Sequence, residues 1–121
     1  MILSAPIPIL RSFSEAKARE FYIDFLGFTV EWEHRFESDL PLYMEIKRGG
    51  LVLHLSEHHG DATPGATLII PVDDIDALHT ELSAKRYGYA RPDIEELPWA
   101  RQLSVTDPFG NRLRFHAPPQ E

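Results

Sequence analysis

The sequence predicts an α+β fold in which two βαβββ modules form a curved mixed sheet. Three observations predict this fold: an amphipathic helical segment occurs twice, each copy is followed by segments with the period-two alternation of strands, and each copy contains a glycine-bearing turn between two such strands. The copies lie about sixty residues apart, as in an internal duplication. A module with one uncovered sheet face needs its twin to cover it, so we expect a single domain over residues 1–121.

The first module, expected over about residues 1–60, begins with a short strand and a helix. Ile7 and Ile9 lie in a proline-punctuated segment, which favours an edge strand because proline donates no hydrogen bond to a ladder. Ser14 is the expected N-cap of the helix, and Gly27 is expected to end it. Between them, apolar residues recur at helical spacing: Ala18, Phe21, Tyr22 and Phe25.

Three strands are expected to follow this helix. Residues 28–36 alternate, which places one set of side chains on a common face of the first strand: Phe28, Val30, Trp32, His34 and Phe36. The opposite face then carries Glu31, Glu33 and Arg35. Residues 42–46 and 51–55 flank Gly49 and Gly50, a pair suited to the positive φ angles of a hairpin turn.

A polar loop over residues 58–65 separates this module from the second, which is expected over about residues 66–117. Its elements are predicted as a strand, a helix and three further strands, over residues 67–72, 73–85, 87–94, 101–106 and 112–116. Within the helix, Ile75, Leu78 and Leu82 are expected to face the sheet. The last two strands flank an Asp-Pro-Phe-Gly-Asn turn at residues 107–111.

The composition argues against several classes of protein. A formal charge of −7, with no run of lysine or arginine, disfavours a nucleic-acid partner; it serves solubility or attracts cationic small molecules. No apolar run approaches the ~18 residues that span a bilayer, and the first residues lack the pattern of a signal peptide. The absence of cysteine fits a reducing compartment. We therefore expect a soluble cytoplasmic protein with no membrane partner.

Three motifs in a fixed order carry a family resemblance. Residues 15–28 contain a Phe-Tyr pair and end in Leu-Gly-Phe, residues 71–78 read Pro-Val-Asp-Asp-Ile-Asp-Ala-Leu, and the Asp-Pro-Phe-Gly-Asn turn precedes the final strand. Together they resemble the glyoxalase and bleomycin-resistance superfamily, also called the vicinal oxygen chelate superfamily. The resemblance spans nearly the whole chain and implies the fold predicted above.

The resemblance also implies where a metal site would lie. In metal-dependent members four ligands come from the first, fourth, fifth and eighth strands, which here correspond to a position near Ile7, then to His54, Thr67 and Arg114. Only His54 can donate to a metal, whereas a divalent site needs three or four converging donors. We therefore expect no metal, no cofactor and no catalytic residue, and an enzyme is not favoured.

What remains is similar to the bleomycin-resistance branch, whose members bind large cationic drugs without a catalytic step. This implies a homodimer with exchanged strand units that sequesters a cationic aromatic or glycopeptide-type ligand in a crevice at the dimer interface. Pro98-Trp99-Ala100-Arg101 resembles the Pro-Trp-Gly segment from which a tryptophan of that branch stacks on the ligand. Trp99 is accordingly an expected ligand contact, unless it only covers the hairpin.

Strand alternation adds further candidates. His54 lies opposite a leucine face, and Arg114 shares a face with Arg112 and His116, so both are expected to line the sheet's concave face. Arg114 either clamps a carboxylate or phosphate of the ligand or pairs with Glu45. The full set of expected ligand contacts is Trp99, His54, Arg114, Phe36, Tyr43, Glu45 and Thr67.

The alternative function is a metal-dependent lyase, isomerase or dioxygenase of the same superfamily with a relocated metal site. His54 would be one ligand, with others drawn from Glu45, His116, His58 and His59. The last two residues begin a polar loop, where solvated side chains are the default. Stoichiometric metal in protein purified without a histidine tag would favour this alternative.

Overall fold

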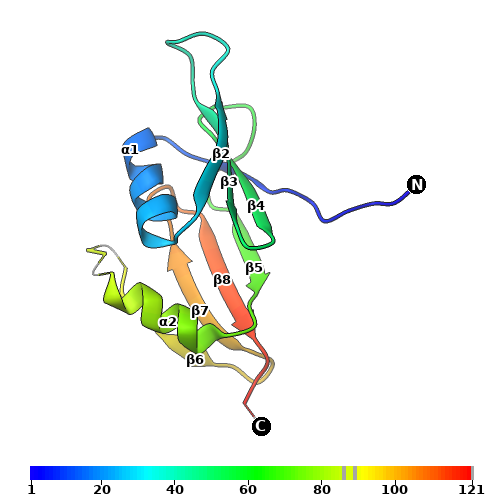
Figure 1. Cartoon of the computed structure of the whole chain (residues 1–121), viewed down its shortest axis with the longest axis vertical. Helices are drawn as coiled ribbons and strands as arrows, with labels where there is room; N and C mark the ends of the chain where they lie inside the picture. Colours follow the sequence, from blue (N-terminus) through cyan, green and yellow to red (C-terminus); the bar gives the residue numbers. More distant parts are fainter. Residues whose placement is uncertain (86, 89, 121) are drawn as a thin grey trace. The chain divides into compact units, whose positions relative to one another are not determined.

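The computed structural model describes residues 1–85, 87–88 and 90–120, in two compact units, Met1–Pro64 and Gly65–Glu121. Each unit contains a four-stranded mixed sheet and helical structure, and most of these elements are labelled in Figure 1. Both units have the element order β-α-β-β-β. The predicted α+β fold of two βαβββ modules is therefore confirmed.

The first unit has its strands in the spatial order β1-β4-β3-β2. Its elements are β1 (Ile9–Arg11), α1 (Glu15–Ala18), η1 (Arg19–Phe25), β2 (Thr29–His34), β3 (Tyr43–Arg48) and β4 (Leu51–Ser56). Strand β1 pairs in parallel with β4, and the other pairs are antiparallel. The predicted edge strand is confirmed within this sheet, although it begins at Ile9 and leaves Ile7 outside.

The helix of the first unit begins and ends where the sequence predicts. Ser14 accepts a hydrogen bond from the backbone N–H of Lys17 at 3.3 Å, and Gly27 ends the helix with a φ of 74°. Between these ends the helix widens after Ala18, since the N–H of Leu26 donates to the carbonyl of Phe21, five residues back, at 2.9 Å. The widened turns bury Phe21, Tyr22 and Phe25.

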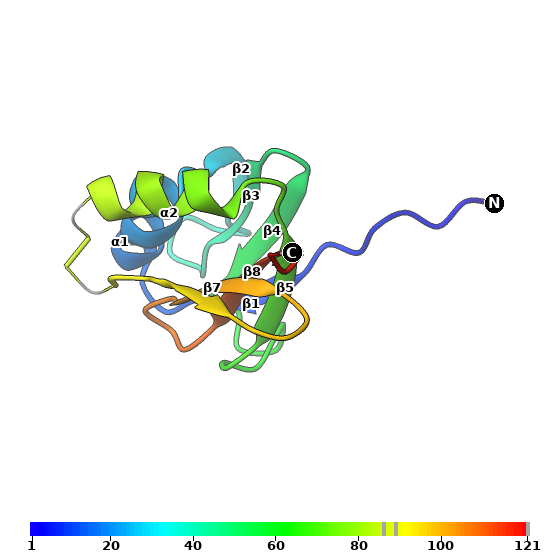
Figure 2. The ribbon, with the colours of Figure 1, turned by 90° about the horizontal axis from the view of Figure 1, so that it is seen from below.

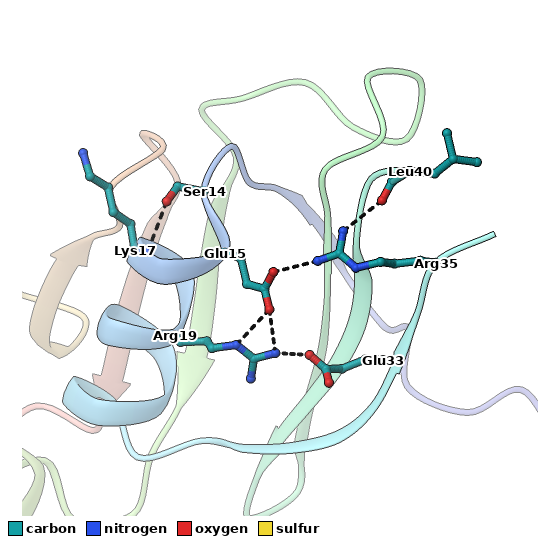
Figure 3. A network of polar contacts seen from close by, with 7 residues as sticks. All are labelled: Ser14, Glu15, Lys17, Arg19, Glu33, Arg35 and Leu40. Atoms are coloured by element: carbon teal, nitrogen blue, oxygen red, sulfur yellow. Dashed lines mark hydrogen bonds and ion pairs between the residues drawn. The ribbon is translucent and has the colours of Figure 1, made fainter. Parts of the chain in front are cut away.

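An ion-pair network holds the start of this helix against β2 and the loop after it (Figure 3). Glu15 pairs with Arg19 at 3.1 Å and with Arg35 at 2.6 Å, and Arg19 also pairs with Glu33 of β2. Arg35 donates further to the carbonyl of Leu40 at 2.9 Å. The carboxylate of Glu33 therefore lies on the helix side of the sheet.

The second unit has its strands in the spatial order β5-β8-β7-β6. Its elements are β5 (Thr67–Pro71), α2 (Ile75–Ala84), β6 (Ile94–Glu96), β7 (Arg101–Thr106) and β8 (Arg112–Ala117). Asp74 caps α2 by accepting from the N–H of Ala77, and Ile75, Leu78 and Leu82 are buried as predicted. Figure 2 shows α2 lying over one face of this sheet, where it packs against β7 and β8.

The strand predicted over residues 87–94 is wrong. Strand β6 covers only Ile94–Glu96, and Tyr89, inside the predicted range, lies outside the described residues. Two physical reasons explain the shift. The N–H of Leu97 donates to the carbonyl of Ala100 at 2.8 Å, so a tight turn pairs β7 with the residues just before it. In addition, Pro92 has no N–H to donate to a ladder.

The Asp-Pro-Phe-Gly-Asn turn between β7 and β8 is held by its own side chains. Buried Asp107 accepts from the backbone N–H groups of Phe109 at 2.9 Å and Asn111 at 2.8 Å, and from the Asn111 side-chain amide at 2.8 Å. Gly110 supplies a φ of 90°. The Asn111 side-chain oxygen also accepts from the N–H of Ala66, just before β5. The polar side chains of this motif therefore hold the turn and the start of β5 in place, and these hydrogen bonds give them a structural role.

Each unit buries the apolar face of its own sheet under its helix. In the first unit this face comprises Leu10, Met44, Ile46, Leu53 and Leu55, and in the second it comprises Leu103, Val105, Leu113 and Phe115. The opposite face of each sheet carries polar and aromatic side chains instead. Among the described residues, no helix is long and apolar enough to cross a membrane.

Candidate ligand-binding face

A bulge in β2 decides which side chains of the first unit lie opposite its helix. Val30 pairs with Ile46, but Trp32 pairs with Glu45, so Glu31 is the extra residue. Because Glu45 and Ile46 are consecutive, their side chains point to opposite faces, and so do those of Val30 and Trp32. The bulge thus brings Trp32 onto the face opposite the helix.

The predicted common face of residues 28–36 is therefore wrong. Phe28 and Val30 lie on the helix side, where the Phe28 ring contacts Tyr22 with centroids 6.1 Å apart. Trp32 and His34 lie on the other side, opposite Glu45 and Tyr43. Phe36 follows the end of β2, is 71% exposed, and has its ring edge-to-face with those of His34 and His58.

Four side chains from β2, β3 and β4 meet on this face and are called the Trp32 cluster: Trp32, Tyr43, Glu45 and His54. The Tyr43 hydroxyl lies 2.6 Å from His54 Nδ1, and His54 Nε2 lies 3.0 Å from Glu45 Oε1. The Trp32 ring is stacked on Tyr43 with centroids 5.9 Å apart at 12°, and lies edge-to-face with His54 at 5.2 Å. The side chain of His54 is only 17% exposed, whereas Trp32 is 43% exposed.

The hydrogen bonds give this cluster a defined polarity. A carboxylate only accepts, so Nε2 of a neutral His54 carries the proton that Glu45 binds. His54 Nδ1 is then an acceptor, and the Tyr43 hydroxyl donates to it. Burial, followed by the charges of Asp61 and Glu45, raises the pKa of Tyr43, which keeps the phenol protonated. The lone pairs of the Tyr43 oxygen and of the Glu45 carboxylate remain as the acceptors of the cluster.

The polar loop after β4 is tied to the end of that strand. The hydroxyl of buried Ser56 donates to Asp61 Oδ2 at 2.5 Å and accepts from the backbone N–H of His58 at 3.1 Å. This arrangement places the Asp61 carboxylate near Tyr43, whose pKa it raises. The Nε2 atom of His58 is buried and has no hydrogen-bond partner among the described residues.

In the second unit, the face opposite α2 carries two of the predicted contacts. Arg114 on β8 lies between Ile69 of β5 and Ser104 of β7, and it is half-buried. Thr67 of β5 is exposed and lies beside Arg112. His116 on the same strand has its Nε2 atom 2.8 Å from the side-chain oxygen of Gln102.

Trp99 lies in the tight turn between β6 and β7. It is 67% exposed, while the following residue, Ala100, is buried. Its indole therefore contributes little to the core of the second unit and is accessible to a planar ligand.

The residues at the superfamily's metal positions do not fit a metal ion. Across the chain segments that the structure describes, no group of three or more histidine, aspartate, glutamate or cysteine side chains could hold one. His54 already has both ring nitrogens engaged, and Thr67 and Arg114 offer a hydroxyl and a cation at two of the other positions. Metal-assisted chemistry has no support in this donor set.

Sequence reasoning found three members of the Trp32 cluster but missed Trp32. His54, Tyr43 and Glu45 were expected to contact a ligand, and the structure brings them together within one unit. Simple alternation assigned Trp32 to the same face as Phe28, because an extra residue in a strand of β-formers leaves no clear trace in the sequence.

The chain is similar to one known protein family. The family model described as glyoxalase superfamily protein matches residues 1–120. No match was found among curated protein sequences.

Solved structures resemble the chain over nearly its whole length. The bleomycin-binding protein from bleomycin-producing Streptomyces verticillus, solved with copper(II)-bleomycin, is 29% identical with a TM-score of 0.70, covering 100% of this chain and 99% of that one. An antibiotic-binding protein from Streptomyces sp. CB03234 is 21% identical with a TM-score of 0.70, covering 98% and 99%. A glyoxylase/bleomycin resistance protein/dioxygenase domain from Frankia sp. EAN1pec is 18% identical with a TM-score of 0.76, covering 98% and 99%. The last two likenesses concern the fold alone.

Proposed function

The chain belongs to the glyoxalase superfamily, and we propose that within it this protein is a metal-independent binding protein that sequesters a cationic aromatic or glycopeptide-type small molecule. The observation that carries the proposal is the Trp32 cluster. It combines an exposed aromatic surface with acceptor groups on one sheet face, and it contains no metal-binding set.

The cluster matches the chemistry of such a ligand. Trp32 and Tyr43 offer stacked rings, and an aromatic pair contributes about 0.5–1.5 kcal/mol beyond the area it buries. Glu45 is 22% exposed and only accepts hydrogen bonds, so a ligand ammonium or guanidinium would gain about 1.5–3 kcal/mol from it. A ligand carboxylate at the same place would meet a second carboxylate. The polarity of the cluster therefore favours a cation or a neutral hydrogen-bond donor.

The similar structures support the same class of ligand. The Streptomyces verticillus protein was solved with copper(II)-bleomycin, and its likeness extends over the whole of this chain. Bleomycin is therefore the appropriate first probe. At 29% identity its own binding residues do not transfer by position, so the proposed contacts rest on the geometry of this chain.

We assign the proposed contacts as follows. Trp32, Tyr43, Glu45 and His54 form the central surface, and Phe36 and Trp99 add exposed rings. Thr67 and Arg114 are included because they lie on the face of the second sheet opposite α2. The ligand is proposed to lie in a crevice of a homodimer. Sedimentation equilibrium should give twice the chain mass, and the mass of a single 13.9 kDa chain at micromolar concentration would contradict this part.

Calorimetric titration of metal-free bleomycin into tag-free protein, with EDTA present, tests the proposal. Saturable binding is expected, and Glu45→Gln should weaken it about tenfold because the substitution removes a charge-assisted contact. Glu31→Gln is the matched control, since it makes the same charge change at the bulge of β2 on an exposed side chain. Equal losses in both variants would show that only the net charge matters and would contradict the proposed site.

One observation favours the alternative, a metal-dependent enzyme with a relocated site. The Nε2 atom of His58 is buried and lacks a hydrogen-bond partner among the described residues. In the tautomer protonated at Nδ1, its lone pair would be able to bind a metal. Elemental analysis of tag-free protein separates the two functions. One equivalent of zinc, nickel, manganese or iron that His58→Ala removes would support the alternative and overturn metal independence.

A further inference from the structure

We infer that Arg112 and Arg114 on β8 form a binding site for an oxyanion, the carboxylate or phosphate group of a small molecule. The two residues are separated by one position, so both side chains leave the same face of the second sheet. Leu113 between them points to the opposite face and is fully buried. Neither the family assignment nor the Trp32 cluster accounts for this pair of guanidinium groups.

The neighbours of this pair on the adjacent strands are neutral. Arg112 lies between Thr67 of β5 and Thr106 of β7, and Arg114 lies between Ile69 and Ser104. Three of these four neighbours carry hydroxyl groups that can donate to an anion. The nearest acidic residue on the same face is Glu95 of β6, which lies beyond β7 and opposite Gln102. Within the described part of the second unit, neither arginine has a hydrogen-bond or ion-pair partner for its side chain.

Arg101, on the helix face of the same sheet, differs from this pair because its side chain is held by carboxylates of the same unit. Its guanidinium binds Asp76 through two hydrogen bonds of 2.8 and 3.0 Å and binds Glu96 through a third of 3.0 Å. These hydrogen bonds, the one to Asp76 first, raise the pKa of Arg101. Two acidic side chains thus pair with this one arginine, whereas Arg112 and Arg114 lie side by side on the other face, although the whole chain has a formal charge of −7.

An oxyanion would offset that repulsion. A guanidinium is planar, permanently charged and able to bind a carboxylate or phosphate through two parallel hydrogen bonds. The position of Arg114, at which the family resemblance implies a metal ligand, then carries the positive charge itself. An anionic group that relatives would hold through a metal ion would here be held directly. This inference goes beyond the proposed function, in which the Trp32 cluster binds a ligand of the opposite charge and Arg114 is only one of the outlying contacts.

The test measures anion binding through the melting temperature of tag-free protein in EDTA. Inorganic phosphate and benzoate are titrated separately, with sodium chloride adjusted to keep the ionic strength constant. Both anions should stabilise the wild type with a saturable dependence on concentration, and the more stabilising one identifies the class of group. Arg112→Gln and Arg114→Gln should each weaken the apparent affinity about tenfold, which corresponds to the loss of one charge-assisted contact.

Two further variants make the result specific. Arg91→Gln removes the same charge from an exposed residue outside the strands of the same unit, and it should leave anion binding unchanged. Arg114→Lys keeps the charge but loses the planar pair of donors, so it should bind more weakly than wild type even if Arg114→Gln fails to fold. Three results would overturn the inference: a rise in melting temperature no larger than that caused by sodium chloride, a rise seen only when EDTA is omitted, or a loss of affinity in Arg91→Gln as large as in the other variants. Failure of the wild type to bind bleomycin would contradict the proposed function and leave this inference standing, because phosphate and benzoate are measured separately.

Discussion

Replacing Tyr43 by phenylalanine removes one hydroxyl from the Trp32 cluster and keeps the ring that stacks on Trp32. The hydroxyl lies 2.6 Å from His54 Nδ1, so the substitution leaves a largely buried nitrogen without its donor. Leaving a buried polar group unpaired costs about 1–3 kcal/mol, and partial exposure of the pair places the loss near the lower end. We expect the free energy of unfolding to fall by about 1 kcal/mol, which lowers the melting temperature by about 3–5 °C for a chain of this size.

A double-mutant cycle measures this interaction directly. Urea unfolding of wild type, Tyr43→Phe, His54→Leu and the double variant should give a coupling energy of about 0.5–1.5 kcal/mol. The cycle removes the separate cost of losing the contact between His54 and Glu45, which both His54 variants share. Additive effects, within about 0.3 kcal/mol, would show that the hydroxyl does not bind the imidazole and that the deduced polarity of the cluster is wrong.

Three further predictions concern the turn, the exposed indole and alkaline pH. Asp107→Ala should lower the free energy of unfolding by about 3–5 kcal/mol, because the buried Asp107 carboxylate accepts three hydrogen bonds from Phe109 and Asn111. Urea unfolding measures this loss, and Asp73→Ala, which changes an exposed aspartate, is the control. Trp99→Ala should change the melting temperature by less than about 2 °C, since Trp99 is 67% exposed. Calorimetry should show that the same variant binds bleomycin more weakly. An unfolded variant would place Trp99 in the core. Tyr43 should contribute stability that is present below pH 10.0 and is lost as the pH rises through its raised pKa. Urea unfolding from about pH 9 to 11 should therefore show a steeper fall in the free energy of unfolding for wild type than for Tyr43→Phe.

Much of the fold follows from local chemistry that the sequence displays. Ser14 and Gly27 mark the ends of a helix because a side-chain acceptor and a positive φ angle are needed there. The strand predicted over residues 101–106 coincides with β7, and its partner β8 follows the predicted turn. In both cases neighbouring residues alone determine the structure.

The errors arise where pairing with distant residues decides the structure. The bulge at Glu31 is a property of the ladder between β2 and β3, and Val30 and Trp32 suit a regular strand equally well. Strand β6 is set by the tight turn that pairs it with β7, which overrides the alternation seen further upstream. The same bulge explains why the polar members of the cluster were predictable while Trp32 was not.

Mapping a ligand onto the first unit is the most direct test of the central claim, that the face opposite its helix binds a small molecule without a metal. Tag-free protein labelled with nitrogen-15 would be titrated with metal-free bleomycin in EDTA, and amide and indole resonances followed. Saturable shifts are expected at Trp32, Tyr43 and His54, whereas the buried Ile46 of β3 should be little affected and Trp32→Ala should bind more weakly. Shifts that require added metal, or saturable shifts that leave Trp32 unchanged, would contradict this claim.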